Sequence, residues 1–162
     1  MERIVKNNEA GNAAGIQRSP EWPKAKEAHL IIEPHCAACF EGSKKTGCLQ
    51  VHHIFPFQYC IALGRPDLEL DQRNLITLCE NEETHPGENH HLLIGHLDDF
   101  KSFNINVKQD ARITFHGLSA SAIRWFSSWQ KKHQNKPQEL EQMTSQEKKE
   151  LKALINRTFP KN

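Results

Sequence analysis

Cysteine and histidine residues are concentrated in one stretch of this chain, and that concentration restricts its fold more than any other feature. Cys36 and Cys39 are separated by two residues, Cys79 follows, and six of the ten histidines fall between residues 52 and 96. Two thiolates at this spacing on a tight turn can bind the same tetrahedral ion. We therefore expect a fold that depends on bound metal rather than on disulfides, which an odd total of five cysteines also disfavours.

The fourth ligand of this predicted zinc site is left open by the spacing. No second Cys-x-x-Cys pair follows Cys79, so either His90 or His85 has to complete a Cys3His set. The alternative interpretation, that Cys36 and Cys39 are ordinary small residues near a helix end, does not account for the later ligands. Two other cysteines have no partner at ligand spacing: Cys48 is expected to pack in the hairpin, and Cys60 to be a loop or core thiol.

Length and composition predict a single domain with or without tails, since the chain has 162 residues, of which 37% are hydrophobic and 25% charged. No apolar run approaches the roughly 20 residues that a membrane helix needs. The first ten residues lack the apolar stretch of a signal peptide. These features predict a cytoplasmic protein without a membrane partner.

Charge is distributed unevenly along the chain. Residues 46–100 carry two Lys/Arg against nine Asp/Glu, whereas residues 101–162 carry twelve against five. A basic flank can contact nucleic-acid phosphates, although a solvated helix face explains it equally well. Trp125 and Trp129 could add contacts to a nucleic-acid backbone, but core packing is the favoured interpretation.

Local signals predict an α+β fold. The expected elements are a helix that Ser19 caps and Pro34 ends, strands over residues 48–52 and 74–79, a short helix over 90–97, a small hairpin over 105–115, a helix around 121–129 and an amphipathic helix after the capping signal at Thr144. We divide the chain into a flexible arm (1–18), a core (19–105) and a C-terminal extension of hairpin plus helices (106–162).

A second group of residues suggests catalysis. His52 and His53 are adjacent on a predicted strand, and Asn74, His91 and His96 follow. Phosphodiester hydrolysis needs a neutral histidine to deprotonate water, a metal ion to neutralise phosphate charge and a group that orients the base. The pattern favours such a centre over a second structural metal site.

These residues resemble the HNH endonuclease family. The resemblance is carried by LQVHHIFP at 49–56, NLITLC at 74–79 and HHLLIGHL at 90–97, with SPEW at 19–22 and Cys36-Ala-Ala-Cys39 upstream. It covers about residues 18–105. It implies a ββα-metal (His-Me finger) core that holds one divalent ion, together with a zinc knuckle, an N-terminal helix and C-terminal helices.

The resemblance also implies a role for each matching residue. His53 corresponds to the general base and Asn74 to the residue that braces the loop and orients the base. His52 and His91 correspond to ligands of the catalytic ion, and His96 is a candidate third ligand. His90 stands where zinc-containing members have a cysteine, so it would complete the zinc site of Cys36, Cys39 and Cys79. An α-helix brings residues i and i+4 onto one face, whereas His91 and His96 are five apart.

Three departures from the family pattern have consequences. The interval from Cys79 to His90 is long, which bears on the fourth zinc ligand. A histidine at position 52 gives a softer ligand set than the usual aspartate, which favours transition metals over Mg2+. The long connection over residues 56–73 is expected to form an extra surface element.

The expected activity is hydrolysis of DNA that depends on a divalent ion at the catalytic site, Mg2+, Mn2+ or Ni2+, and leaves a 5′-phosphate and a 3′-hydroxyl. Partners would be DNA and either a second copy of the chain or a phage or defence protein. A zinc-stabilised nucleic-acid-binding module without catalysis is the alternative, and a structural protein with an incidental histidine cluster is a second one. The pairing of His53 with Asn74 favours the enzyme, because a structural zinc requires neither residue.

Overall fold

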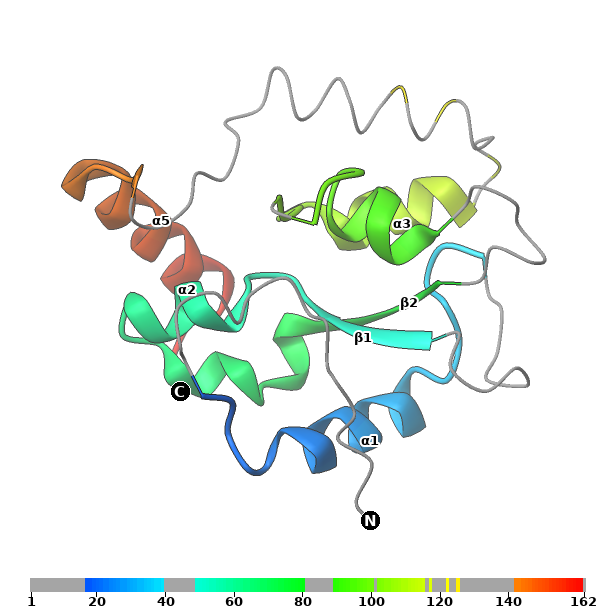
Figure 1. Cartoon of the computed structure of the whole chain (residues 1–162), viewed down its shortest axis with the longest axis horizontal. Helices are drawn as coiled ribbons and strands as arrows, with labels where there is room; N and C mark the ends of the chain where they lie inside the picture. Colours follow the sequence, from blue (N-terminus) through cyan, green and yellow to red (C-terminus); the bar gives the residue numbers. More distant parts are fainter. Residues whose placement is uncertain are drawn as a thin grey trace, which may run out of the picture.

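Two antiparallel strands lie at the centre of the chain. The structure, a computed structural model, describes residues 17–39, 49–80, 89–100, 102–115, 117, 122, 125 and 142–161. β1 (Leu49–His53) pairs with β2 (Leu75–Cys79), so that His52 is opposite Ile76 and His53 opposite Leu75. With helices on both sides of this hairpin, the fold is a mixed α+β arrangement, as predicted (Figure 1).

Helix α1 (Trp22–Ile32) covers one face of the hairpin (Figure 1). Trp22 is buried in a small apolar cluster with Val51 and Leu75. His29, two turns later on the same face, is buried as expected, but Ile32 is 66% exposed and does not belong to the buried face. The helix therefore packs through the face that carries Trp22 and His29 and leaves its last residues, Ile31 and Ile32, in solvent.

The start of α1 differs from the prediction. Ser19 accepts the backbone N–H of Trp22 through its carbonyl at 3.0 Å and that of Glu21 through its hydroxyl at 3.2 Å. It thus closes a turn that precedes the helix, and Glu21 occupies the N-cap position. The helix ends before Pro34 as expected, because the ring of a proline disfavours the helical conformation of the residue that precedes it.

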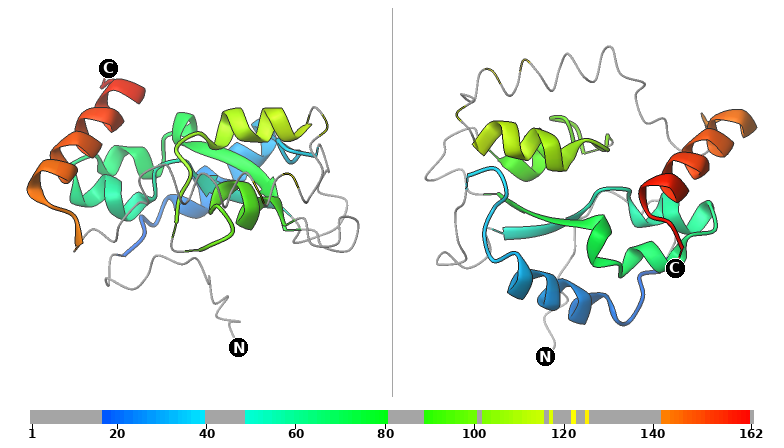
Figure 2. Two further views of the ribbon diagram at one scale, coloured as in Figure 1. Left: turned by 90° about the horizontal axis from the view of Figure 1, so that it is seen from above. Right: turned by 180° about the vertical axis from the view of Figure 1, so that it is seen from behind.

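The opposite face of the hairpin carries the larger core. It is covered by η4 (His91–Gly95), a π-helical turn, and by α3 (Val107–Phe115) beyond it (Figures 1 and 2). Apolar side chains of β1, β2 and the following segments meet there, and the largest of them include Phe55, Leu78, Leu93, Phe103 and Ile155.

The predicted hairpin over residues 105–115 is wrong, because α3 occupies this segment. Its buried residues are Val107, Asp110, Ala111 and Thr114. They follow the i, i+3, i+4, i+7 spacing of one helix face. The β-branched residues that suggested strands include Ile113, which instead points outward and is 42% exposed.

The connection between the two strands is part of the core, so the predicted surface element is also wrong. It forms α2 (Phe57–Ala62) and two 3-10 turns, η2 (Pro66–Glu69) and η3 (Gln72–Asn74). Tyr59, Cys60 and Leu68 are buried among the main core residues. Cys60 is a core thiol as expected, and burial raises its pKa to about 12.

Helix α5 (Ser145–Thr158) confirms the amphipathic helix expected after Thr144. The Thr144 hydroxyl accepts the backbone N–H of Glu147 at 3.2 Å, and the Glu147 carboxylate accepts that of Thr144 at 2.7 Å. The buried guanidinium of Arg65 donates to Asn156 Oδ1 at 2.9 Å and to the carbonyl of Phe159 at 2.8 Å. These bonds fasten α5 beside α2, away from the free end of the hairpin (Figure 1).

Several predictions concern residues at the edge of the described chain or beyond it. Residues 1–16, Cys48, His85, Trp129 and most of the helix expected around 121–129 lie outside the described residues. Arg18, which we assigned to the flexible arm, packs its guanidinium 4.5 Å from the ring centre of Trp22. Trp125 is 67% exposed, so its expected core packing is wrong.

Within the described ranges, no helix combines the length and apolarity that crossing a membrane requires.

Candidate metal centres

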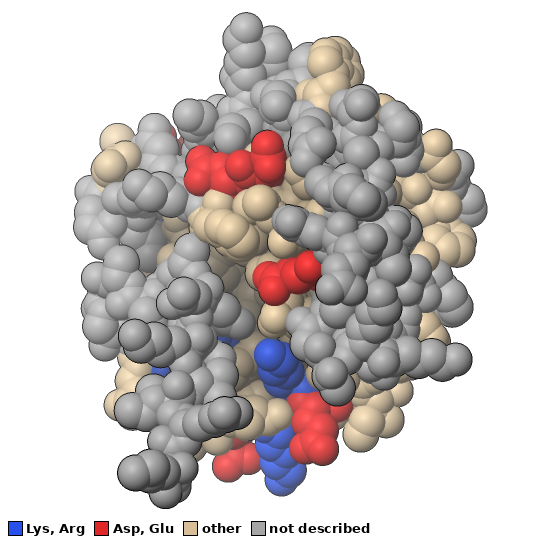
Figure 3. All heavy atoms as spheres, turned by 45° about the vertical axis from the view of Figure 1, so that its right-hand side comes forward, with Lys and Arg blue, Asp and Glu red and all other residues tan. Residues whose placement is uncertain are grey.

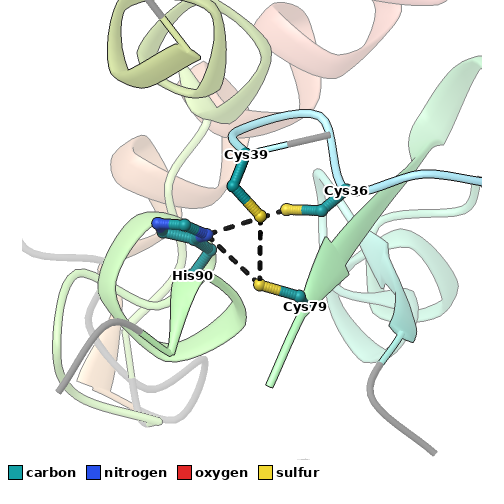
Figure 4. Close-up of side chains that lie close together, drawn as sticks. All are labelled: Cys36, Cys39, Cys79 and His90. Atoms are coloured by element: carbon teal, nitrogen blue, oxygen red, sulfur yellow. Dashed lines mark hydrogen bonds between the residues drawn. The ribbon is translucent and has the colours of Figure 1, made fainter. Parts of the chain in front are cut away.

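Three cysteines and one histidine converge at the edge of the hairpin where β2 ends. One ligand atom from each of Cys36, Cys39, Cys79 and His90 lies within 4.8 Å of the others. Figure 4 shows the three sulfur atoms and the His90 ring pointing toward a common centre. We call this group the Cys3His cluster; it contains His90, one of the two candidates for the fourth position, while His85 lies outside the described residues.

The separations within the Cys3His cluster fit a tetrahedral zinc ion. The Sγ atoms of Cys39 and Cys79 are 3.6 Å apart, and His90 Nδ1 is 3.2 Å from Cys79 Sγ and 3.8 Å from Cys36 Sγ. Zn–S bonds near 2.3 Å and Zn–N bonds near 2.0 Å in a tetrahedron place neighbouring ligand atoms about 3.5–3.8 Å apart. The cluster could therefore bind a metal such as zinc without rearrangement of its backbone.

Local backbone geometry favours the thiolate form of Cys36, the first of the two cysteines after α1. The backbone N–H of Ala38 donates to Cys36 Sγ at 3.4 Å, and that of Ala37 donates to the carbonyl of Thr77 at 3.0 Å. The turn is thus held against β2. Hydrogen bonds from Cys39 and Cys79 are the main reason why the pKa of Cys36 falls to about 3. A thiolate is the form that ligates metal.

Three histidines form a second group on the face of the hairpin covered by η4. One ring nitrogen from each of His52, His91 and His96 lies within 4.8 Å of the others. The ring centres of His52 and His91 are 5.2 Å apart, those of His52 and His96 are 4.8 Å apart, and those of His91 and His96 are 4.9 Å apart. We call this group the three-histidine cluster; its residues are those that the resemblance implied as ligands of a catalytic ion.

Hydrogen bonds at Nδ1 leave Nε2 available in two histidines of the cluster, and the third has a buried Nε2 without a partner among the described residues. His91 Nδ1 lies 2.7 Å from Glu80 Oε1, and His96 Nδ1 donates to the carbonyl of Ser102 at 2.8 Å. His52 Nε2 is buried and has no hydrogen-bond partner among the described residues. Ligating histidines usually donate their other N–H to a carboxylate or carbonyl. The pattern leaves Nε2 of His91 and His96, together with the orphaned Nε2 of His52, as the ligand atoms.

A π-helical turn explains how His91 and His96 meet despite a spacing of five residues. η4 runs from His91 to Gly95, and such a turn is wider than an α-helical one because its hydrogen bonds span five residues. It is terminated by two residues in the left-handed region, Leu97 at φ 53° and Asp98 at φ 61°. An α-helix, which brings residues i and i+4 onto one face, would not bring these two rings together.

Close approach of backbone to ring fixes Gly95 beside His52. A Cβ atom at position 95 would lie 3.1 Å from Cε1 and 3.2 Å from Nδ1 of His52. These separations are shorter than ordinary van der Waals contact. The glycine, which interrupts an otherwise apolar helical run, therefore allows η4 to pack directly on the His52 ring.

Burial keeps two histidines of the cluster, His52 and His96, in the neutral form that binds metal. Desolvation, with smaller contributions from the neighbouring histidines, holds the pKa of His52 well below its ordinary value. Desolvation likewise lowers the pKa of His96 to about 4. Three imidazoles around one centre form a ligand set suited to transition metals.

His53 lies on the other face of β1, where it contacts α1 rather than the three-histidine cluster. Its ring centre is 4.5 Å from that of Trp22 and 6.2 Å from that of Phe57. His53 Nε2 donates to the carbonyl of Glu69 at 2.9 Å, which leaves Nδ1 as the unprotonated nitrogen of a neutral ring. Desolvation by burial is the main reason why its pKa is lowered to about 4.

Asn74 braces the loop after β1, as its predicted role requires. Its side chain accepts the backbone N–H of Phe55 at 2.9 Å and donates to the carbonyls of Phe55 and Leu68 at 3.0 Å. Leu68 precedes Glu69, whose carbonyl holds His53. The connection between Asn74 and His53 therefore runs through the backbone of η2 and not through a direct hydrogen bond.

Sequence reasoning missed three residues that support these clusters. Glu80 contacts His91, Gly95 admits the His52 ring, and Asn104 donates to the carbonyl of Ile94 at 3.0 Å and to Asp110 Oδ2 at 2.6 Å. Only Gly95 gave a signal, as a glycine within a helical pattern. Glu80 follows Cys79 directly, but nothing in the sequence pairs it with a residue eleven positions later.

Comparisons of the chain with protein-family models, with curated proteins and with solved structures found no match.

Proposed function

We propose that this protein is a metal-dependent endonuclease that hydrolyses DNA phosphodiester bonds, with a ββα-metal core formed by β1, β2 and η4. The observation that carries the proposal is the three-histidine cluster between hairpin and η4, in which one ring nitrogen of each histidine lies within 4.8 Å of the others. It lies beside a Cys3His cluster that fits structural zinc. This combination is what the resemblance to HNH endonucleases implied for the same residues.

In this proposal the chain supplies ligands, a base and a brace. His52, His91 and His96 hold the divalent ion, which stabilises charge on the phosphate and on the departing 3′ oxygen. His53 accepts a proton from the attacking water at Nδ1, the ring nitrogen that the bond to Glu69 leaves unprotonated. Asn74 keeps the η2 backbone, and hence the His53 ring, in place.

The ligand set favours Mn2+ or Ni2+ over Mg2+ as the activating ion. Imidazole nitrogen suits Ni, Zn and related transition metals, whereas Mg2+ prefers oxygen ligands. No carboxylate belongs to the three-histidine cluster among the described residues. The cluster is most accessible at His96, where the neighbouring Phe100 ring is 42% exposed and 5.1 Å away between ring centres.

The proposal assigns contacts with the DNA backbone to the C-terminal third of the chain. On the face shown in Figure 3, described acidic and basic side chains lie next to one another. Residues 101–162, by contrast, carry twelve Lys/Arg against five Asp/Glu. Lys149, Lys152 and Arg157 of α5 are exposed and provide positive charge that phosphates can contact.

A second candidate function is a nucleic-acid-binding module that does not cut. The placement of His53 favours it, because this ring is 6% exposed, lies against Trp22 and is on the opposite face of β1 from His52. Catalysis requires the pocket around His53 to admit water and phosphate on DNA binding. A binding module makes no such requirement.

Plasmid cleavage tests the two functions against each other. Supercoiled plasmid is incubated with zinc-loaded protein in Mg2+, Mn2+, Ni2+ or EDTA, and nicked and linear forms are quantified. We expect nicking with Mn2+ or Ni2+, none with EDTA, and at least a hundredfold loss in His53→Ala, since general-base catalysis contributes about 10²–10⁴-fold.

The matched control for this experiment is His35→Ala, which removes a histidine outside both clusters. It should cleave like the wild type, and His53→Ala should retain zinc and stay folded at the assay temperature, with a lower melting temperature because a buried ring and its bond to Glu69 are lost. Equal cleavage by His53→Ala and wild type would show that the base is wrongly assigned. A DNA gel shift without cleavage in any metal would favour the binding module.

A further inference from the structure

We propose that Glu80 is a positioning residue of the three-histidine cluster, which holds the His91 ring with Nε2 toward the ion and links this cluster to the Cys3His cluster. The inference rests on the metal site of the proposed function but not on the cleavage step. It concerns a residue that neither the sequence motifs nor the resemblance singled out.

The contact between Glu80 and His91 sets the tautomer of His91. Glu80 Oε1 lies 2.7 Å from His91 Nδ1, and an ionised carboxylate can only accept a hydrogen bond. His91 Nδ1 therefore carries a proton, and in the neutral ring the lone pair is on Nε2. Without this acceptor, the proton can move to Nε2 and block the ligand atom.

Glu80 is itself held by a neighbouring strand residue. Gln50 Nε2 donates to Glu80 Oε2 at 3.2 Å across the hairpin. The two carboxylate oxygens therefore have different partners, and the rotation of the side chain is fixed from both sides. Its carboxylate is not within the group of convergent ligand atoms, so it acts on the ion through His91 and not as a ligand.

Chain connectivity joins the two clusters at two places. Cys79 of the Cys3His cluster is followed by Glu80, and His90 of the same cluster is followed by His91. Zinc held by Cys79 and His90 would thus fix the backbone on both sides of the Glu80–His91 contact. Binding at one cluster is expected to prepare the other, and thermodynamic linkage makes this coupling reciprocal.

The chain offers a matched carboxylate–histidine pair away from both clusters. Glu33 Oε2 lies 3.2 Å from His29 Nε2, and the Glu33 side chain is 40% exposed, against 32% for Glu80. Glu33→Ala removes a carboxylate–histidine contact at the end of α1, and neither Glu33 nor His29 belongs to a cluster. It separates an effect on metal binding from a general loss of stability.

The test is isothermal titration calorimetry, in which Ni2+ is titrated into full-length protein loaded with one equivalent of Zn2+. Glu80→Ala should weaken Ni2+ binding by about 10–100-fold, the usual cost of losing a residue that orients a metal ligand. Glu80→Gln should lose less, because its amide oxygen still accepts the Nδ1–H of His91. Glu33→Ala should bind Ni2+ like the wild type.

Histidine side-chain 15N NMR provides the second readout, which a merely structural role would not change. Before Ni2+ is added, His91 should be a single Nδ1–H tautomer in the wild type and a mixture in Glu80→Ala. Wild-type Ni2+ affinity in Glu80→Ala, or an unchanged His91 tautomer, would overturn the inference, as would absence of Ni2+ binding by the wild type. Ni2+ binding without plasmid cleavage would overturn the proposed cleavage and leave the role of Glu80 intact.

Discussion

His90 and His91 are consecutive residues whose side chains belong to two different clusters. His90 Nδ1 is 3.2 Å from Cys79 Sγ, whereas His91 Nδ1 is 2.7 Å from Glu80 Oε1 and its ring lies beside His52. Consecutive residues at the start of a helical turn point in different directions around its axis. The start of η4, with His90 as its N-cap and His91 as its first residue, thereby supplies a ligand to each cluster.

Loss of a thiolate from the Cys3His cluster should unfold this region. We expect Cys36→Ser to lose zinc and to melt at a much lower temperature, because the binding energy of structural zinc is folding energy. Zinc content by atomic absorption and the melting temperature by circular dichroism measure both effects. Cys60→Ala, which removes a buried thiol outside the cluster, should keep its zinc. An unchanged zinc content in Cys36→Ser would contradict the assignment.

A methyl group at position 95 should disturb the three-histidine cluster while leaving zinc bound. The Cβ of Gly95→Ala would lie 3.1 Å from the His52 ring, so either the ring or η4 has to shift. Alanine normally stabilises a helix by about 1 kcal/mol relative to glycine, so a weaker Ni2+ affinity would report the collision. At Gly117 an added Cβ meets nothing within 4 Å, and although its φ of 114° strains an alanine locally, this residue is outside both clusters and Gly117→Ala should bind Ni2+ normally. Equal Ni2+ affinities would mean that His52 is not held by this packing.

Truncation of Asn74 should destabilise the loop that follows β1. Its fully buried side chain makes three hydrogen bonds, and their loss strands buried backbone groups of Phe55 and Leu68. Each of the three stranded groups costs about 1–3 kcal/mol, so Asn74→Ala should lower the unfolding free energy by at least about 3 kcal/mol in urea denaturation. The exposed Asn106→Ala is the control and should change it little. Wild-type stability in Asn74→Ala would refute the bracing role.

The thiol of Cys60 should resist alkylation in the folded protein. Burial raises its pKa to about 12, whereas a free cysteine ionises near pH 8.5. Iodoacetamide at pH 8 should therefore leave Cys60 unmodified until urea is added, as peptide mass mapping can measure. Above about pH 9 the unfolded chain loses this proton and the folded chain keeps it, so stability should fall as the pH rises. Rapid modification without urea would place Cys60 outside the core.

The elements that depend on near neighbours in the sequence were predicted well. Short alternating segments gave both strands, and the Thr144–Glu147 signal gave the start of α5. In residues 105–115 two periodicities competed. The β-branched residues there predicted a hairpin, but the segment is a helix because Val107 and Ala111 are buried on one helix face. The connection from Phe57 to Asn74 was misjudged for a related reason, since its apolar residues are buried by contacts that no local pattern records.

The sequence by itself determined that Cys36 and Cys39 could share a tetrahedral ion, because ligand chemistry and a two-residue spacing are local properties, and it offered the distant Cys79 as a third ligand. Only the tertiary structure decided that His90 joins them while His91 turns to His52 and His96. That division depends on the π-helical width of η4, on the absence of a side chain at Gly95 and on the Glu80 carboxylate. These are packing and hydrogen-bond effects between residues that are distant in the sequence, which no local pattern records.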